Sequence, residues 1–144
     1  MSMSNYLAKE LLDHVFGGGN RNFVSPTKLY VFTSRVDPGE FGLGLSEPSD
    51  AAYLRRSCKY SDFDVAHSDA THTTSDVGLH NAVEFAFPQS TEAQGTITHF
   101  GITDSSDLTV NGNVLGSGTL TTPKAIASST IVRFNASDLT FYLD

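Results

Sequence analysis

Tryptophan, disulfide-forming cysteines, basic residues and long apolar runs are scarce or absent in this sequence of 144 residues. Cys58 is its only cysteine, which excludes an intrachain disulfide. The sequence has nine Lys and Arg and 16 Asp and Glu, which gives a formal net charge of −7. This negative charge argues against a nucleic-acid partner bound through its phosphates. No apolar run approaches the roughly 20 residues of a membrane-spanning helix, so no membrane association is expected.

Lysine and arginine are entirely missing between Tyr60 and Pro123. That stretch carries eight acidic residues and a net charge of −8, so the rest of the chain nets +1 (−7 minus −8). A solvated acidic face is the plain interpretation. The alternative is an orientation, in which the basic-leaning N-terminal part, including Arg55 and Arg56, faces an acidic partner. The start of the chain has no charged segment followed by an apolar run, which predicts synthesis in the cytoplasm without a secretory signal.

The length suits one domain, and the local patterns divide it into an N-terminal helix and arm (1–27) and a β domain (28–144). Ser4 can serve as the N-cap of a helix. Apolar residues then recur at spacings of three to five and form one stripe, which a short helix must bury against its own sheet or a neighbouring chain: Leu7, Leu11, Leu12, Val15 and Phe16. Gly17-Gly18-Gly19 is expected to end the helix through a left-handed cap.

The remainder alternates short β-rich runs with turn residues, which predicts an antiparallel β-sandwich or barrel of about seven or eight short strands. In Leu108–Leu115, the Asn111-Gly112 pair is a strong signal for a two-residue hairpin. The other expected strands are 28–35, 51–60, 82–87, 95–102, 119–121, 131–134 and 139–143.

Motifs for catalysis are weak. No glycine-rich phosphate loop or nucleophile elbow is present. The acidic, histidine-rich loop 61–80 has side chains that could hold a metal, but it lacks a recognised ligand spacing. Its candidate ligands are Asp62, Asp64, His67, Asp69, His72, Asp76 and His80. His99, in an expected core strand, is interpreted as a structural histidine. No catalytic residue, cofactor or metal site is therefore assigned, and no enzyme is expected.

The order of several motifs resembles a family of small virion proteins of tailed bacteriophages, commonly labelled tail-fibre, minor tail or structural proteins. The resemblance covers both ends of the chain and is weakest between Ala51 and His80. It rests on the opening SNYLAKELLDHVFGGG, the SPTKLYVFTSRVDPGEFGLGLSEPS segment, Thr98-His99-Phe100-Gly101-Ile102, Leu120–Lys124 and Leu139–Asp144. It implies a virion component without catalytic residues.

Three roles remain open at this point. The first is a capsid cement protein on the virion surface, a homo-oligomer (a trimer is expected) that binds the major capsid protein in many copies. The second is a tail, baseplate or fibre-attachment protein, and the third is a host-directed enzyme or metal-dependent binder. For the first role the expected partner interface comprises Leu7, Leu11, Leu12, Val15, Phe16, Arg21, Arg55 and Arg56.

Overall fold

The computed structural model describes residues 2–17, 23–64, 78–109 and 112–142 of the chain. Strands dominate, and the α-helix that the structure describes, α1, is Asn5–Phe16. The 3-10 helix η1 is Tyr60–Asp62. The strands are β1 (Ser2–Met3), β2 (Leu29–Ser34), β3 (Arg56–Cys58), β4 (Gly78–His80), β5 (Phe85–Ala86), β6 (Gly95–Thr103), β7 (Val114–Ile126), β8 (Arg133–Phe134) and β9 (Thr140–Tyr142). The expected mainly β fold with one N-terminal helix is confirmed.

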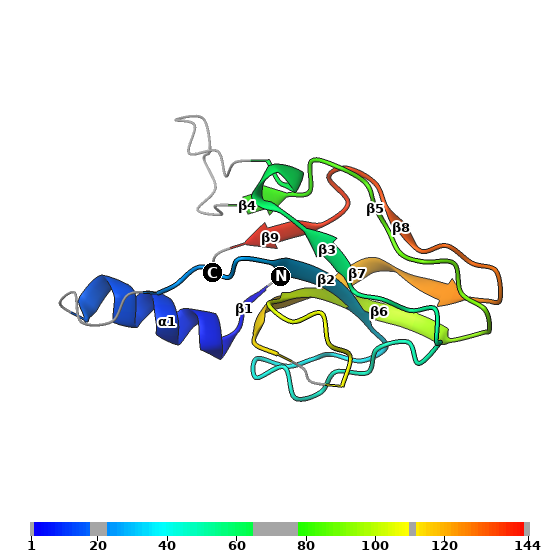
Figure 1. Ribbon diagram of the computed structural model, residues 1–144, viewed down its shortest axis with the longest axis horizontal. Helices are drawn as coiled ribbons and strands as arrows, with labels where there is room; N and C mark the ends of the chain where they lie inside the picture. Colours follow the sequence, from blue (N-terminus) through cyan, green and yellow to red (C-terminus); the bar gives the residue numbers. More distant parts are fainter. Residues whose placement is uncertain (1, 18–22, 65–77, 110–111, 143–144) are drawn as a thin grey trace.

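Five strands form the larger sheet, in the order β1-β7-β6-β2-β3, and each pairs antiparallel with its neighbours. Two short antiparallel pairs, β4-β9 and β5-β8, make up the rest. Figure 1 shows these pairs stacked over the larger sheet, with α1 projecting beyond one end. The described strands therefore form two layers and do not close into a barrel.

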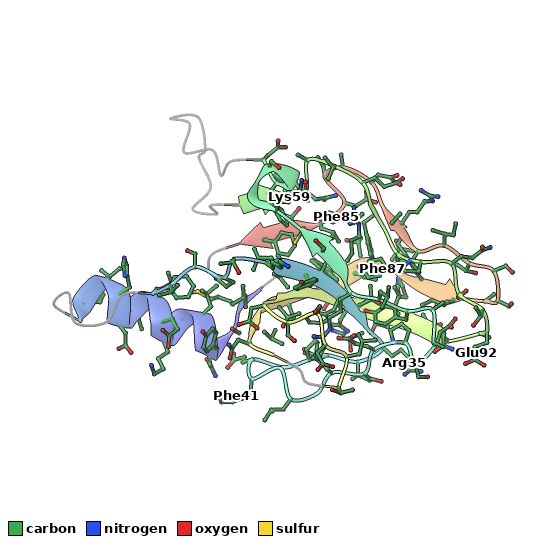
Figure 2. The ribbon with its side chains drawn as sticks, in the orientation of Figure 1. Arg35, Phe41, Lys59, Phe85, Phe87 and Glu92 are labelled. Atoms are coloured by element: carbon green, nitrogen blue, oxygen red, sulfur yellow. The ribbon has the colours of Figure 1, made fainter. Side chains whose placement is uncertain are left out.

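Aromatic rings fill the space between the layers. Phe100 of β6 meets Phe141 of β9 edge to face, with the ring centroids 5.6 Å apart. Phe63 contacts both Phe141 and Phe85 in the same geometry, which brings the positive edge of one ring to the negative face of another. Phe85 and Phe87 are buried in this core (Figure 2), whereas Val83, two residues before Phe85, is 40% exposed. One continuous aromatic cluster thus joins the two layers.

The opposite face of the larger sheet has a smaller buried region beneath the loop that follows β2. Phe32 is fully buried but lies outside the main core, because successive side chains of a strand alternate between faces. Its ring lies over Gly101, where an added Cβ would come within 2.4 Å of the ring and 2.6 Å of the Gly116 carbonyl oxygen. The loop is held there by the Ser46 N–H, which donates to the Ser34 hydroxyl at 3.1 Å.

The connection between β6 and β7 differs from the expectation. The short strand predicted before Asn111-Gly112 is absent, because Leu108 and Thr109 form a turn and β7 begins only at Val114. The Asp104 carboxylate closes the connection by accepting the backbone and side-chain N–H groups of Asn113, both at 2.8 Å. Gly112 does take a positive φ of 65°, whereas Asn111 lies outside the described residues.

Other boundaries are also corrected. The strand expected at 51–60 shrinks to β3, because Asp50 instead organises a turn: its carbonyl accepts from Tyr53 N–H and its carboxylate from Ala52 N–H, both at 2.9 Å. β1 and β4 were not expected, and β1 joins the N-terminal arm to the sheet beside Ser117. The division at residues 27 and 28 stays a prediction. No helix among the described residues is long and apolar enough to cross a membrane.

Candidate functional site

Helix α1 is fixed to the β domain at its N-terminal end. Ser4 is the N-cap, as expected, and its hydroxyl accepts the Leu7 N–H at 3.2 Å. The buried Ser4 also donates its own N–H to the Leu115 carbonyl at 3.0 Å, and Asn5 donates to the Glu40 carbonyl at 3.1 Å. These bonds hold the first turn of the helix against β7 and the loop after β2.

The C-terminal end of α1 has few contacts with the domain. Its last turn closes on the Gly17 N–H, which donates to the Asp13 carbonyl at 2.9 Å. Gly17 has a φ of −76°, so the left-handed cap expected here is wrong for this residue, and Gly18 and Gly19 lie outside the described residues. The backbone N–H of Phe23, on the returning arm, donates to Nδ1 of His14 at 3.2 Å.

The apolar stripe of α1 is only partly covered. Leu7 and Leu11, nearer the anchored end, are half-buried. Exposure then rises toward the free end: Leu12 is 58% exposed, Val15 67% and Phe16 79%. These three residues, spaced i, i+3 and i+4, share one face and are called the helix tip below. A short helix without a single buried residue presents this face for a partner.

An apolar groove of about 730 Å³ lies beside the base of α1. It is bounded by the helix, the arm that precedes β2, and the strands β2, β3, β6 and β7. Among the described residues, Lys28 and Lys59 are the charged ones in its lining. Figure 2 shows Lys59 near the start of η1, at the end of β3. The apolar walls include Leu7, Phe23, Pro26, Leu29, Ile102 and Leu115.

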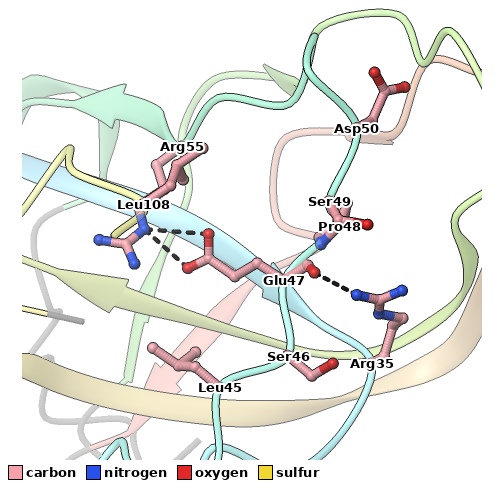
Figure 3. A pocket seen from close by; sticks show the side chains of 9 residues that line it. All are labelled: Arg35, Leu45, Ser46, Glu47, Pro48, Ser49, Asp50, Arg55 and Leu108. Atoms are coloured by element: carbon pink, nitrogen blue, oxygen red, sulfur yellow. Dashed lines mark hydrogen bonds and ion pairs between the residues drawn. The ribbon is translucent and has the colours of Figure 1, made fainter. Parts of the chain in front are cut away.

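A second, polar pocket of about 380 Å³ lies at the opposite end of the sheet (Figure 3). Arg55, expected at a partner interface, is buried here instead, and its Nε donates to Oε1 of Glu47 at 2.8 Å. Its Nη1 donates to the Ser105 carbonyl at 2.8 Å. Burial raises the pKa of Glu47, and the positive charge of Arg55 opposes that rise. The guanidinium of Arg55 is therefore part of the internal structure of the protomer.

Arg35 and Gln94 extend this network to neighbouring loops. Arg35 donates to the Glu47 carbonyl at 2.6 Å, while its buried Nε has no hydrogen-bond partner among the described residues. The Gln94 side-chain oxygen accepts the N–H groups of Ser49 and Asp50 at 2.8 and 3.1 Å. Apart from Nε of Arg35, the polar groups named here are paired with other groups of the protein, so the pocket is best explained as the place where several loops meet. No local sequence pattern predicted this pocket, because Gln94 lies 45 residues from Ser49.

The remaining candidates are placed as follows. Arg56 is exposed on β3 and donates to the Ser57 carbonyl, whereas Arg21 lies outside the described residues. Most of the loop 61–80 also lies outside them, so its metal site stays untested. Within the described ranges no group of three or more His, Cys, Asp or Glu residues gathers as metal ligands would.

Two other reactive side chains are held in structural settings. Burial raises the pKa of the Cys58 thiol to about 12, and the thiol of this buried residue therefore stays protonated at neutral pH. His99 is half-buried in β6, with Nδ1 2.8 Å from the Thr98 hydroxyl and Nε2 3.3 Å from the Thr119 hydroxyl. The helix tip and the apolar groove therefore remain as two apolar surfaces of the described chain that the site residues above do not occupy.

Comparison with known proteins covers nearly the whole chain. The profile of one protein family, described as Podophage GP4 fiber I protein gp80, matches residues 2–142. No curated protein matches the chain. The family description agrees with the phage virion resemblance and favours the fibre-attachment alternative over capsid cement.

Proposed function

The chain belongs to the family of the podophage GP4 fiber I protein gp80, a family of phage virion structural proteins, and from this premise we propose that it is a fibre or fibre-attachment subunit of a phage tail. The observation that carries the proposal is the match over residues 2–142, which includes helix α1 as well as both β layers. The unit proposed to act in the virion is therefore the whole described fold.

The geometry supports attachment through α1. A structural subunit must bury apolar surface against a neighbour to stay bound, at roughly 25 cal/mol per Å². Helix α1 offers that surface on a projecting element whose base is hydrogen-bonded to the domain, so docking requires little reordering of the chain. The partners proposed are other proteins of the virion.

The same proposal makes the protein non-enzymatic. Its buried thiol, its threonine-bound His99 and the internally paired Arg55 each have a structural partner or setting. The polar pocket beside Glu47 supports this view, because its arginines bind carbonyl groups and a carboxylate of the protein itself.

Purified virions test the location. Quantitative mass spectrometry should find the chain in a small, fixed number of copies relative to the major capsid protein, and antibody labelling in electron micrographs should mark the tail. Amounts comparable with the major capsid protein, with label over the whole shell, would instead establish the capsid-cement role. Absence from washed virions would refute both roles.

A further inference from the structure

The helix tip has no place to bind within its own protomer. The bonds of Ser4 and Asn5 fix the base of α1. A helix rises 1.5 Å per residue, so Phe16 lies about 14 Å along the axis from Leu7, which lines the apolar groove. Figure 1 shows the helix pointing away from the sheet. A straight, anchored helix cannot bend back to fill a groove at its own base, so the described part of its own domain leaves the tip exposed.

The groove has mostly apolar walls, which match the apolar side chains of the helix tip. It is bounded by the base of α1, the arm that precedes β2 and four strands of the larger sheet. The tip residues Leu12, Val15 and Phe16 lie on one face, as needed for a helix laid into a groove. Both surfaces occur on every copy of the chain.

Charge complementarity selects a second copy as the occupant. Lys28 and Lys59 bring two positive charges to the groove, and no ion pair of either is found among the described residues. Helix α1 carries Glu10 and Asp13 against Lys9, a net charge of −1 with His14 neutral. The C-terminal end of a helix also bears about half a negative charge, at the very turn that holds Val15 and Phe16. A tip in the groove would meet both lysines.

We infer that the protein self-associates by placing the helix tip of one copy in the apolar groove of the next. The contact joins two different surfaces, so each copy both donates a helix and receives one, and closure gives a ring. The inference rests on the proposed structural role and names the neighbour that covers the helix. Isologous pairing of two helix tips is the alternative arrangement, and a mixing experiment separates the two.

The experiment uses two variants of the full chain. The tip variant, Leu12→Ser with Phe16→Ser, keeps an intact groove; the groove variant, Lys28→Glu with Lys59→Glu, keeps an intact tip. Light scattering coupled to size-exclusion chromatography should show the wild type as an oligomer and each variant alone as a monomer. Loss of two apolar anchors should weaken association by about 100-fold or more. Mixed one to one, the variants should form a heterodimer through the one intact tip and the one intact groove.

The substituted side chains are exposed, so folding should be retained, and circular dichroism and thermal unfolding verify this. Phe41→Ser with Leu43→Ser, two residues that are 73% and 82% exposed on the loop after β2, is the matched control and should stay oligomeric. A groove variant that remains oligomeric alone would establish tip-to-tip pairing and overturn the inference. A monomeric wild type would also overturn it, while the virion measurement would still decide the proposed tail location.

Discussion

Gly101 sets how closely a ring on the second face of the sheet can pack. We predict that Gly101→Ala lowers the free energy of unfolding by about 1–3 kcal/mol, because its Cβ would overlap the Phe32 ring and the Gly116 carbonyl oxygen. Chemical denaturation measures the loss. Phe32→Leu added to Gly101→Ala should recover part of it, since the nearest ring atom is removed while the carbonyl remains. An unchanged unfolding midpoint for Gly101→Ala would contradict this packing.

The type of a residue does not predict whether its side chain is buried when its contact partner is distant in the sequence. Arg55 reads as a surface cation in the sequence, yet Glu47 and the Ser105 carbonyl bury it. Leu12 and Phe16 read as a core stripe or an interface, and only the structure shows that their own domain leaves them exposed. Periodicity thus predicts that the helix-tip residues share one face, and the structure adds that this face is exposed. The groove could not be predicted in this way, because it combines the arm, the base of α1 and four strands.

At the scale of elements, local sequence patterns predict the helix and the longer strands, whereas contacts between distant residues determine where the short strands lie. Helix α1 was predictable from its Ser4 cap and apolar spacing, and β2 and β6 from their β-branched and aromatic runs. Among the short strands, β5, β8 and β9 lie within the expected runs 82–87, 131–134 and 139–143, whereas β4 was not expected, and all four have only two or three residues. Their placement depends on side chains that bind across the chain, of which Asn81 is the clearest example.

Asn81 joins the segments around the short strand pairs. This fully buried amide donates to the carbonyls of Val83 and Asn135 at 2.8 and 2.7 Å and accepts the Leu139 N–H at 2.8 Å. Asn135 is 54 residues away in the chain. No local pattern could reveal such a contact, yet it sets where β9 begins.

We predict that Asn81→Ala lowers the free energy of unfolding by about 2–4 kcal/mol, because a fully buried side chain is removed and three backbone groups, including the buried Leu139 N–H, lose their partner. Urea denaturation followed by circular dichroism measures the loss. Asn5→Ala is the matched control: its amide donates to the Glu40 carboxylate at 3.2 Å on the exposed surface, and the effect should stay within about 0.5 kcal/mol. Equal losses for the two variants would refute the special role of Asn81.

At the scale of the whole molecule, the division of charge along the chain does not become a division in space. Arg55 of the basic-leaning part donates to the Ser105 carbonyl, which belongs to the stretch without lysine or arginine. Glu84 of the acidic stretch pairs with Arg133 at 2.6 Å. Orientation toward a partner therefore depends on local surfaces such as the groove with Lys28 and Lys59. The acidic residues instead affect the stability of the fold at low pH.

Asp50 is the carboxylate through which acid should act on the fold. Its side chain accepts hydrogen bonds from the Thr91 hydroxyl at 2.6 Å, from the Ala52 N–H at 2.9 Å and from the backbone N–H groups of Thr91 and Glu92. These bonds lower its pKa to about 2. They join the turn before β3 to the turn that connects β5 to β6, two segments in which Asp50 and Thr91 lie 41 residues apart in the chain.

A carboxylate whose pKa is depressed by folding stabilises the protein above its ordinary value of 3.8, and this contribution is lost as the pH falls toward about 2. We predict that Asp50→Asn is less stable than the wild type at pH 7 and that the difference shrinks between about pH 4 and pH 2. Denaturant titrations across that range measure both chains. Asp64→Asn, a change at an exposed carboxylate, is the control and should follow the wild type throughout. A stability difference for Asp50→Asn that stays constant down to pH 2 would show that the charge of Asp50 does not hold the two turns together.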